Sequence, residues 1–288
     1  MILPDFIIPS RVNKYWLESG IDSKNLCFDK IHFAKYPYAV DYRYNSRGYR
    51  DQEWPDDLYN AIWCIGDSFT VGLGSPLTHT WPYILQQTSN KRIINISMDG
   101  ASNNWIARKS LEIIRSISPK NLIIHWSFFS RGETENKDRP DDERLIPRKY
   151  LTIKNQFENF KNNFTLLETN KKDVNIVHSF IPNASPVQWD HLIQVRWDEL
   201  KGTSWPNLAP TDRNSFNKLS KEIIAELKQF NFYDELCNSY DFFHILKNTI
   251  QGTKFVPQLK QLDRARDGHH YDIVTATSLV KSIFPLVV

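Results

Sequence analysis

Short apolar runs that alternate with amphipathic stretches constrain the fold of this 288-residue chain more than any other feature. The runs at 61–65, 92–96, 121–126 and 174–180 are rich in Ile, Leu and Val, as in strands buried on both faces. Segments with apolar residues at helical spacing lie between and after them, at 80–88, 102–116, 150–168, 213–230 and 271–284. This alternation predicts an α/β protein: a three-layer α/β/α sandwich with a flavodoxin-like, mainly parallel sheet of about five strands.

The rest of the chain does not follow this pattern. Residues 1–58 are rich in Tyr, Pro and charge, and they predict an N-terminal extension packed on a main domain at 59–288, with one short helix near 14–19. The segment 183–212 is a long connection that carries Trp189, Trp197 and Trp205. The segment 233–260 fits neither a helical nor a strand period.

Composition excludes several classes of protein. Thirty-six Lys and Arg against 33 Asp and Glu give a net charge of +3, which argues against a basic nucleic-acid groove. No apolar run is long enough to span a membrane. The first nine residues lack the basic region and cleavage site of a signal peptide, so we expect a cytoplasmic protein. Three cysteines without C-x-x-C spacing exclude a disulfide framework and fit a reducing compartment.

Polar residues directly after the apolar runs are candidate site residues, because parallel sheets bind ligands beyond the carboxyl ends of their strands. Gly66, Asp67 and Ser68 follow the first run. A serine at a strand-to-helix turn is exposed there and can attack an acyl carbon when a base removes its proton. Gly66 would permit an unusual turn. The alternative is an ordinary turn in which Asp67 or Ser68 caps a helix.

A second candidate is the segment Asp267-Gly268-His269-His270, just before the last predicted helix. A carboxylate at i and an imidazole at i+3 can pair through Nδ1, which leaves Nε2 of His270 for a serine hydroxyl. Taken alone, the pattern fits better with Asp267 capping the helix. A metal site that includes His269 and Asp272 is disfavoured, because neighbours in sequence point in different directions and no other His-rich segment completes it.

Together these segments resemble the conserved blocks of the SGNH or GDSL-type serine hydrolases. The first block is similar to Ile65–Thr70 and the last block to Asp267–His270. The stretch Asn45–Arg50 resembles the lead-in of many members, and Asn95–Gly100 resembles the second block. The resemblance extends from about residue 42 to the C-terminus and makes 59–288 an SGNH-hydrolase-like catalytic domain.

The resemblance implies a role for each matching residue. Ser68 would be the nucleophile, His270 the general base and Asp267 its orienting partner. The backbone N–H groups of Ser68 and Gly100 would form part of the oxyanion hole. No cofactor and no metal would be needed.

The third family block is where this chain departs from the pattern. The family usually has Gly-x-Asn-Asp after the third strand, and the Asn side chain is the third oxyanion donor. Here the chain reads Trp126-Ser127-Phe128, and we expect the Ser127 hydroxyl to substitute. The hydroxyl of Ser130 and the side chains of Asn103 and Asn104 are alternatives.

Five further side chains are expected near the substrate: Asp67, Asn103, His125, Arg131 and Trp189. The resemblance implies a serine esterase that hydrolyses a carboxylic ester through an acyl-serine intermediate. Aromatic residues in the 183–212 segment suit a sugar ring, so an O-acetyl group on a carbohydrate is the expected substrate. An O-acyltransferase with the same site and a non-catalytic ligand-binding module are the alternatives. A large separation of Ser68 and His270 would favour the module. Nothing in the sequence indicates an oligomeric state.

Overall fold

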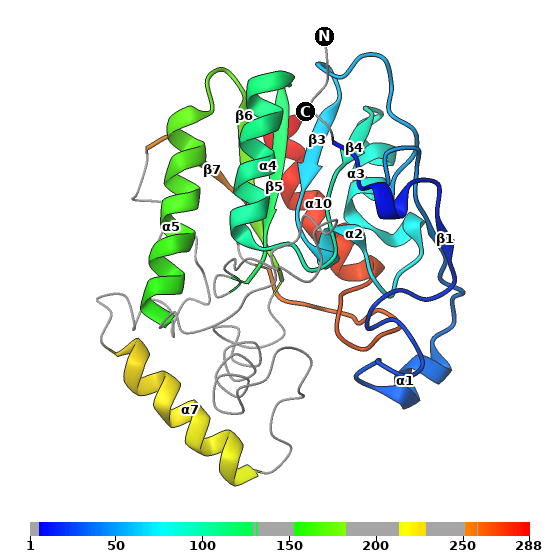
Figure 1. Cartoon of the computed structure of the whole chain (residues 1–288), viewed down its shortest axis with the longest axis vertical. Coiled ribbons are helices and arrows are strands. Elements are labelled where there is room, and N and C mark those ends of the chain that lie inside the picture. The colour runs from blue at the N-terminus through cyan, green and yellow to red at the C-terminus, as the bar shows by residue number, and fades with distance from the viewer. Residues whose placement is uncertain (1–5, 129–130, 132–152, 183–212, 229–250, 258) are drawn as a thin grey trace.

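The computed structural model describes residues 6–128, 131, 153–182, 213–228, 251–257 and 259–288 (Figure 1). A parallel five-stranded sheet has the strand order β4-β3-β5-β6-β7. Its strands are Ile62–Ile65 (β3), Ile93–Asn95 (β4), Asn121–Trp126 (β5), Asn175–Phe180 (β6) and Lys254–Phe255 (β7). Counted from β3, this is the flavodoxin-like order 2-1-3-4-5, so the predicted fold class is confirmed.

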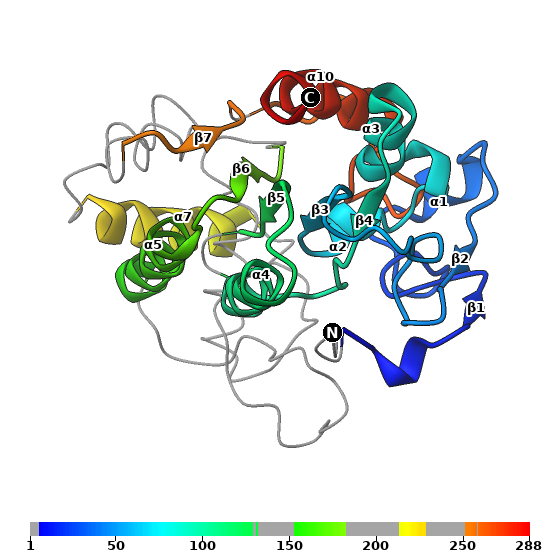
Figure 2. The same cartoon turned by 90° about the horizontal axis from the view of Figure 1, so that it is seen from above.

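Helices cover both faces of the sheet, as Figure 2 shows. One face carries α4 (Asn103–Ser116) and α5 (Ile153–Asn170), and α7 (Arg213–Leu227) packs against α5. The other face carries α3 (Trp81–Ser89) and α10 (Ile273–Val287), which pack on each other. The sandwich therefore has the three layers predicted from the sequence.

Each face of the sheet has its own hydrophobic core. Trp63 and Ile65 of β3 belong to the core under α4 and α5, whereas Ile62 and Cys64 belong to the core under α3 and α10. Successive side chains of a strand point to opposite faces, and both faces are covered. All four residues of β3 are therefore buried, and the strand appears in the sequence as an unbroken apolar run.

Residues 6–58, called the N-terminal segment below, lie on the β4 side of the sheet (Figure 2). They contain η1 (Pro9–Arg11), β1 (Tyr15–Trp16), α1 (Lys30–Lys35) and β2 (Tyr42–Arg43), and β1 pairs with β2 in an antiparallel manner. The short helix predicted near 14–19 is wrong. That stretch holds β1, whose Tyr and Trp favour strands, and the helix forms later in the segment, where the Asp29 carboxylate caps it.

After the N-terminal segment, three short elements of the described residues were not predicted. They are α2 (Ser68–Val71), η2 (Leu77–His79) and β7, which lies in the segment that fitted no period. β7 has two residues, so it is too short to show any period in the sequence. Its Phe255 stacks on Phe164 of α5, with ring centroids 5.5 Å apart. No helix among the described residues has both the length and the apolar character needed to cross a membrane.

Candidate active site

Ser68 is the first residue of α2, a single helical turn that starts at the carboxyl end of β3. The Asp67 carboxylate caps this turn by accepting the N–H of Phe69 at 3.0 Å. Gly66 does not have a positive φ, so the expected unusual turn is wrong. Glycine is needed there for space, because a Cβ would lie 2.3 Å from Oγ1 of Thr70. The capping role of Asp67 and the placement of Ser68 at the sheet edge occur together.

The Asp267–His270 turn meets Ser68 at this edge. Oδ1 of Asp267 accepts the backbone N–H of His269 at 2.9 Å and that of His270 at 3.0 Å. Oδ2 of Asp267 lies 2.5 Å from Nδ1 of His270, and Nε2 of the same ring lies 2.8 Å from Oγ of Ser68. Asp267 does not cap α10, whose N-cap is Asp272. The structure therefore brings together the three residues predicted for the catalytic roles.

The surroundings of this relay determine the charge of its members. Burial alone would lower the pKa of His270, but the charge and hydrogen bond of Asp267 together outweigh burial and raise it above its ordinary value. Burial alone would raise the pKa of Asp267, yet the charge and hydrogen bond of His270 lower it below the ordinary range. Asp267 is therefore an anion at neutral pH, and His270 is a stronger base than a free imidazole.

Two backbone N–H groups were predicted to form part of the oxyanion hole. Those of Ser68 and Gly100 have no hydrogen-bond partner among the described residues. Gly100 follows β4, and its φ of +72° lies in the left-handed region that glycine adopts without strain. The backbone around it is held by two hydrogen bonds: the Met98 N–H donates to the Gly66 carbonyl at 3.1 Å, and the Ala101 N–H to the Met98 carbonyl at 3.1 Å.

The residue that follows β5 occupies the place of the family's third block. Oγ of Ser127 donates to Oδ2 of Asp67 at 2.6 Å, and both side chains are buried. Nη1 of Arg131 lies 3.2 Å from the same carboxylate oxygen. The Ser127 hydroxyl proton is therefore already used in this structure, and it would reach an oxyanion only by leaving Asp67. A role of Ser127 in the oxyanion hole stays a prediction.

Asn103 and Asp67 were both expected to contact substrate, and both are instead bonded to the protein. Oδ1 of Asn103 accepts the N–H of Ser127 at 3.0 Å, and its Nδ2 donates to the carbonyl of Phe128 at 2.8 Å. Asn103 thus fastens the loop after β5 to the start of α4. The second N–H of its amide is not used by these bonds, so a contact of Asn103 with substrate stays a prediction.

His125 was expected to be a buried, hydrogen-bonded histidine and the further histidine nearest the pocket, and it is fully buried. Its ring lies near those of Trp81 and Tyr271, with centroids 5.9 and 6.4 Å away. Nδ1 is 2.8 Å from Oγ of Ser179, and burial lowers the pKa of His125 to about 3. His125 is a neutral core residue without access to a substrate. Trp189 lies outside the described residues.

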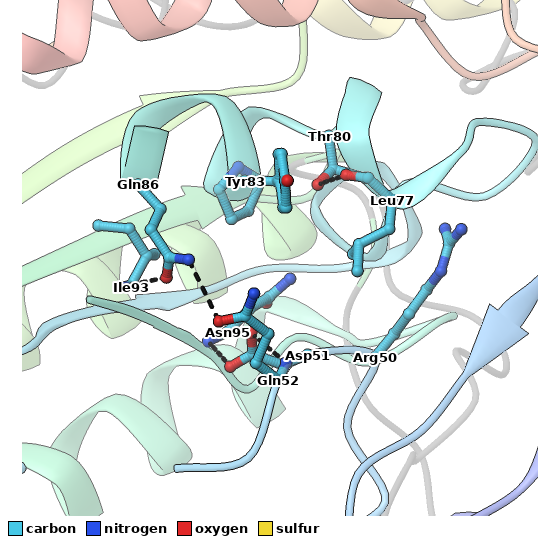
Figure 3. Close-up of a pocket in the computed structure, with 10 residues that line it drawn as sticks. Arg50, Asp51, Gln52, Leu77, Thr80, Tyr83, Gln86, Ile93 and Asn95 are labelled. Carbon is cyan, nitrogen blue, oxygen red and sulfur yellow. Dashed lines mark hydrogen bonds between the residues drawn. The ribbon is translucent and has the colours of Figure 1, made fainter. Parts of the chain in front are cut away.

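The described residues offer no metal site: no group of three or more His, Cys, Asp or Glu side chains among them is arranged to hold an ion. A small pocket lies apart from the relay, and Figure 3 shows it between residues 50–52, the start of α3 and β4. Asp51 and Asn95 at its wall are joined by a hydrogen bond from the Asn95 N–H, 3.0 Å long. Neither Ser68 nor His270 contributes to this pocket.

Comparisons with known proteins were made with the sequence and with the structure. No family model matches the sequence, and no curated protein matches it. Among solved structures, the chain is similar to a family two carbohydrate esterase from Clostridium thermocellum, in complex with cellohexaose (13% identity, 81% of this chain and 65% of that chain, TM-score 0.39). It is also similar to a GDSL-like lipase from Bacteroides thetaiotaomicron (13%, 82% and 91%, 0.37) and to a lipase/acylhydrolase from Enterococcus faecalis (13%, 78% and 94%, 0.36). At such identities and TM-scores, activity has to be argued from this chain's own residues.

Proposed function

We propose that this chain is a serine esterase that hydrolyses a carboxylic ester through an acyl-serine intermediate. The observation that carries the proposal is the continuous relay from Asp267 through His270 to Ser68, with contacts of 2.5 and 2.8 Å. A buried carboxylate, an imidazole made more basic by it and a hydroxyl on Nε2 are the parts that activate a serine. The match of both sequence blocks to the SGNH pattern supports the same assignment.

In the proposed mechanism, each group of the site has one role in the reaction. Nε2 of His270 takes the proton of Ser68 as Oγ attacks the ester carbonyl carbon. The oxygen that becomes negative is stabilised by the free N–H groups of Ser68 and Gly100. The tetrahedral intermediate breaks its bond to the alcohol oxygen, which leaves with the proton from His270. A water then attacks the acyl-serine, again through His270, and releases the acid and the free serine.

The contact between Ser68 and His270 also bears on the two alternative functions. A non-catalytic module would be favoured by a large separation of Ser68 and His270, and the two side chains are in hydrogen-bond contact instead. An acyltransferase would use the same acyl-serine and differ only in the acceptor, an alcohol in place of water. Hydrolysis needs no second binding site, and it is therefore the proposal.

The first test is covalent labelling with a fluorophosphonate probe, which reacts with activated serines. Native protein should be labelled, and Ser68→Ala and His270→Ala should not be. Ser179→Ala is the matched control, because this buried hydroxyl also lies 2.8 Å from a histidine nitrogen and should leave labelling intact. Absence of labelling in a well-folded native protein would contradict the proposal.

The finer substrate proposal is an O-acetyl group on a carbohydrate. It depends on aromatic residues of the 183–212 segment, which lies outside the described residues. Release of acetate from acetylated saccharides, compared with release of long-chain acids from p-nitrophenyl esters, tests it. Turnover of the saccharides alone would support it, and turnover of the long-chain esters alone would contradict it.

A further inference from the structure

Gly74 connects the loop behind Ser68 to two other parts of the molecule. It lies six residues after Ser68. Its N–H donates to the hydroxyl of Tyr42 at 2.8 Å, and its carbonyl accepts the N–H of Arg266 at 2.9 Å. Tyr42 belongs to the N-terminal segment, and Arg266 precedes the catalytic Asp267. Both catalytic loops and the N-terminal segment therefore meet at this residue.

Asp22 of the N-terminal segment closes these contacts into a ring. Its Oδ2 accepts the Tyr42 hydroxyl at 2.5 Å. The guanidinium of Arg266 binds both carboxylate oxygens, Nε to Oδ1 and Nη2 to Oδ2, each at 2.8 Å. Asp22 and Tyr42 are fully buried, so these bonds are shielded from water. The ring runs from Asp22 to Tyr42, Gly74, Arg266 and back to Asp22.

The two catalytic loops are also in direct contact inside the ring. A Cβ at Gly74 would lie 2.9 Å from Cβ of Ala265 and 3.0 Å from Cγ of Asp267, so only glycine fits. Gly74 therefore lets the Ser68 loop pack tightly against the Asp267 loop.

Arg50 supplies a second tether between the N-terminal segment and the Ser68 loop. Its Nη1 donates to the carbonyls of Val71 at 3.1 Å and Gly72 at 2.6 Å, and its Nη2 donates to that of Ser75 at 2.8 Å. Its guanidinium lies 4.3 Å from the ring centroid of Tyr42. The carbonyls at the end of α2, which have no partner within that turn, are thus bound by a buried cation.

We propose that Asp22, Tyr42 and Arg50 are positioning residues, which hold the Ser68 loop against the Asp267–His270 turn. The N-terminal segment is then a working part of the active site and not only a cover on the core. This inference rests on the proposed esterase function for its catalytic meaning. Its structural content, that the ring keeps the His270 imidazole in place, stands independently and can be measured without any substrate.

Two conservative variants test the proposal. Tyr42→Phe removes only the hydroxyl that joins Asp22 to Gly74 and keeps the aromatic side chain that contacts Arg50. Asp22→Asn weakens the paired contact with Arg266. Each should lower the plateau rate of fluorophosphonate labelling at high pH by at least about tenfold, because small misplacements of reacting groups have large effects on rate.

Asp51→Asn is the matched control. Asp51 also joins the N-terminal segment to the core through an arginine, at 2.9 Å from Nη2 of Arg92, but its carboxylate binds the backbone of Asn95 in β4 and no residue of the two catalytic loops (Figure 3). This variant should lose stability, measured by thermal unfolding, and keep the native labelling rate per folded molecule. Native labelling in both ring variants would overturn the proposal. A labelling rate that falls as much in Asp51→Asn as in Tyr42→Phe would also overturn it.

A readout without activity separates this proposal from the proposed function. The proton on Nδ1 of His270 lies between the imidazole and the Asp267 carboxylate. The rate at which this proton exchanges with water is measured by NMR. The exchange should accelerate at least about tenfold in Tyr42→Phe and stay unchanged in Asp51→Asn. If native protein is not labelled, the esterase proposal fails and this exchange still decides the inference: equal exchange in all variants would overturn it.

Discussion

Among the described residues, two buried serine–histidine pairs have the same contact distance and different surroundings. Ser68 and His270 are 2.8 Å apart, and so are Ser179 and His125. On the other ring nitrogen, His270 meets the Asp267 carboxylate, whereas Nε2 of His125 is buried without a partner among the described residues. Burial alone then lowers the pKa of His125, and Asp267 reverses that direction for His270. A serine–histidine contact becomes a candidate catalytic pair only through its third member.

A third histidine completes the comparison. Nε2 of His178 lies 2.9 Å from Oε1 of Glu168, but its Nδ1 accepts the indole N–H of Trp126 at 3.0 Å. This pair has the carboxylate and lacks the hydroxyl. Burial lowers the pKa of His178 despite Glu168, and the Nε2–H of the ring donates to that carboxylate, so neither ring nitrogen is free to accept a proton from a hydroxyl. His178 is a structural residue of the core. Among the described residues, only His270 has a carboxylate on one ring nitrogen and a serine hydroxyl on the other.

The largest expected effect comes from Asp267→Asn, which removes the carboxylate from the Ser68–His270 pair and makes it resemble the Ser179–His125 pair. The amide cannot hold His270 in the tautomer that leaves Nε2 free, and a corresponding change in other serine hydrolases lowers kcat roughly 10⁴-fold. The rate of ester turnover, or of probe labelling, should fall by that order. A variant that keeps native turnover would show that the carboxylate is not what distinguishes the two pairs.

Glu168→Gln tests the Glu168–His178 pair and should affect stability, not activity. Removing one partner of a buried pair costs about 3 kcal/mol of unfolding free energy, measured by urea denaturation at pH 7. Burial would raise the pKa of Glu168, but His178, Lys171 and Thr253 lower it to about 2. The folded state thus binds fewer protons than the unfolded state, so this stabilisation is full above about pH 4.5 and is lost as pH falls toward 2. A penalty that does not shrink at low pH would contradict this account.

The pH dependence of labelling sharpens the difference between the first two histidines. His270 must be neutral to accept a proton, and its pKa is raised above 6.5. The labelling rate should therefore increase about tenfold per pH unit below the midpoint and level off above it. The midpoint should lie above 6.5. A midpoint below that value would mean that Asp267 does not outweigh burial.

The smallest expected effect is that of Ser127→Ala. Its hydroxyl is bound to Asp67 at 2.6 Å, so we expect about a tenfold loss of turnover, smaller than the 10²–10³-fold loss typical of an oxyanion-hole donor. A loss of the larger size would show that the hydroxyl turns to the oxyanion during reaction. Unchanged turnover would remove Ser127 from the site.

The sequence predicted the sheet for a physical reason, and it predicted the three central residues from two segments together with their resemblance to the SGNH blocks. Strands buried on both faces are apolar throughout, and their carboxyl ends meet at one edge, so Ser68 after β3 could be placed beforehand. The spacing of Asp267 and His270 corresponds to one turn of backbone, a local relation that a sequence displays directly. His125 is buried and hydrogen-bonded as expected, but a histidine at a strand end gives no sign of whether it faces the pocket or the core.

The contacts that hold the site in place could not be predicted. Asp22, Tyr42 and Arg266 are far apart in the chain, and none of them stands in a motif. The polar partners of Ser127 and Asn103 depend on side-chain directions within the folded loops. Gly74 was visible as part of a glycine pair, but its tight contact with Ala265 requires the packed structure.

The distance along the chain between Ser68 and His270 has a consequence for synthesis in the cell. The two residues are 202 positions apart, and the ribosome produces chains from the N-terminus. Ser68 and the strand before it are translated early, while His270 and Asp267 emerge only after every described strand of the sheet. A nascent chain therefore lacks the base for Ser68 through most of translation. Premature termination before residue 265 would yield a product without the proposed esterase activity, however well its sheet had formed.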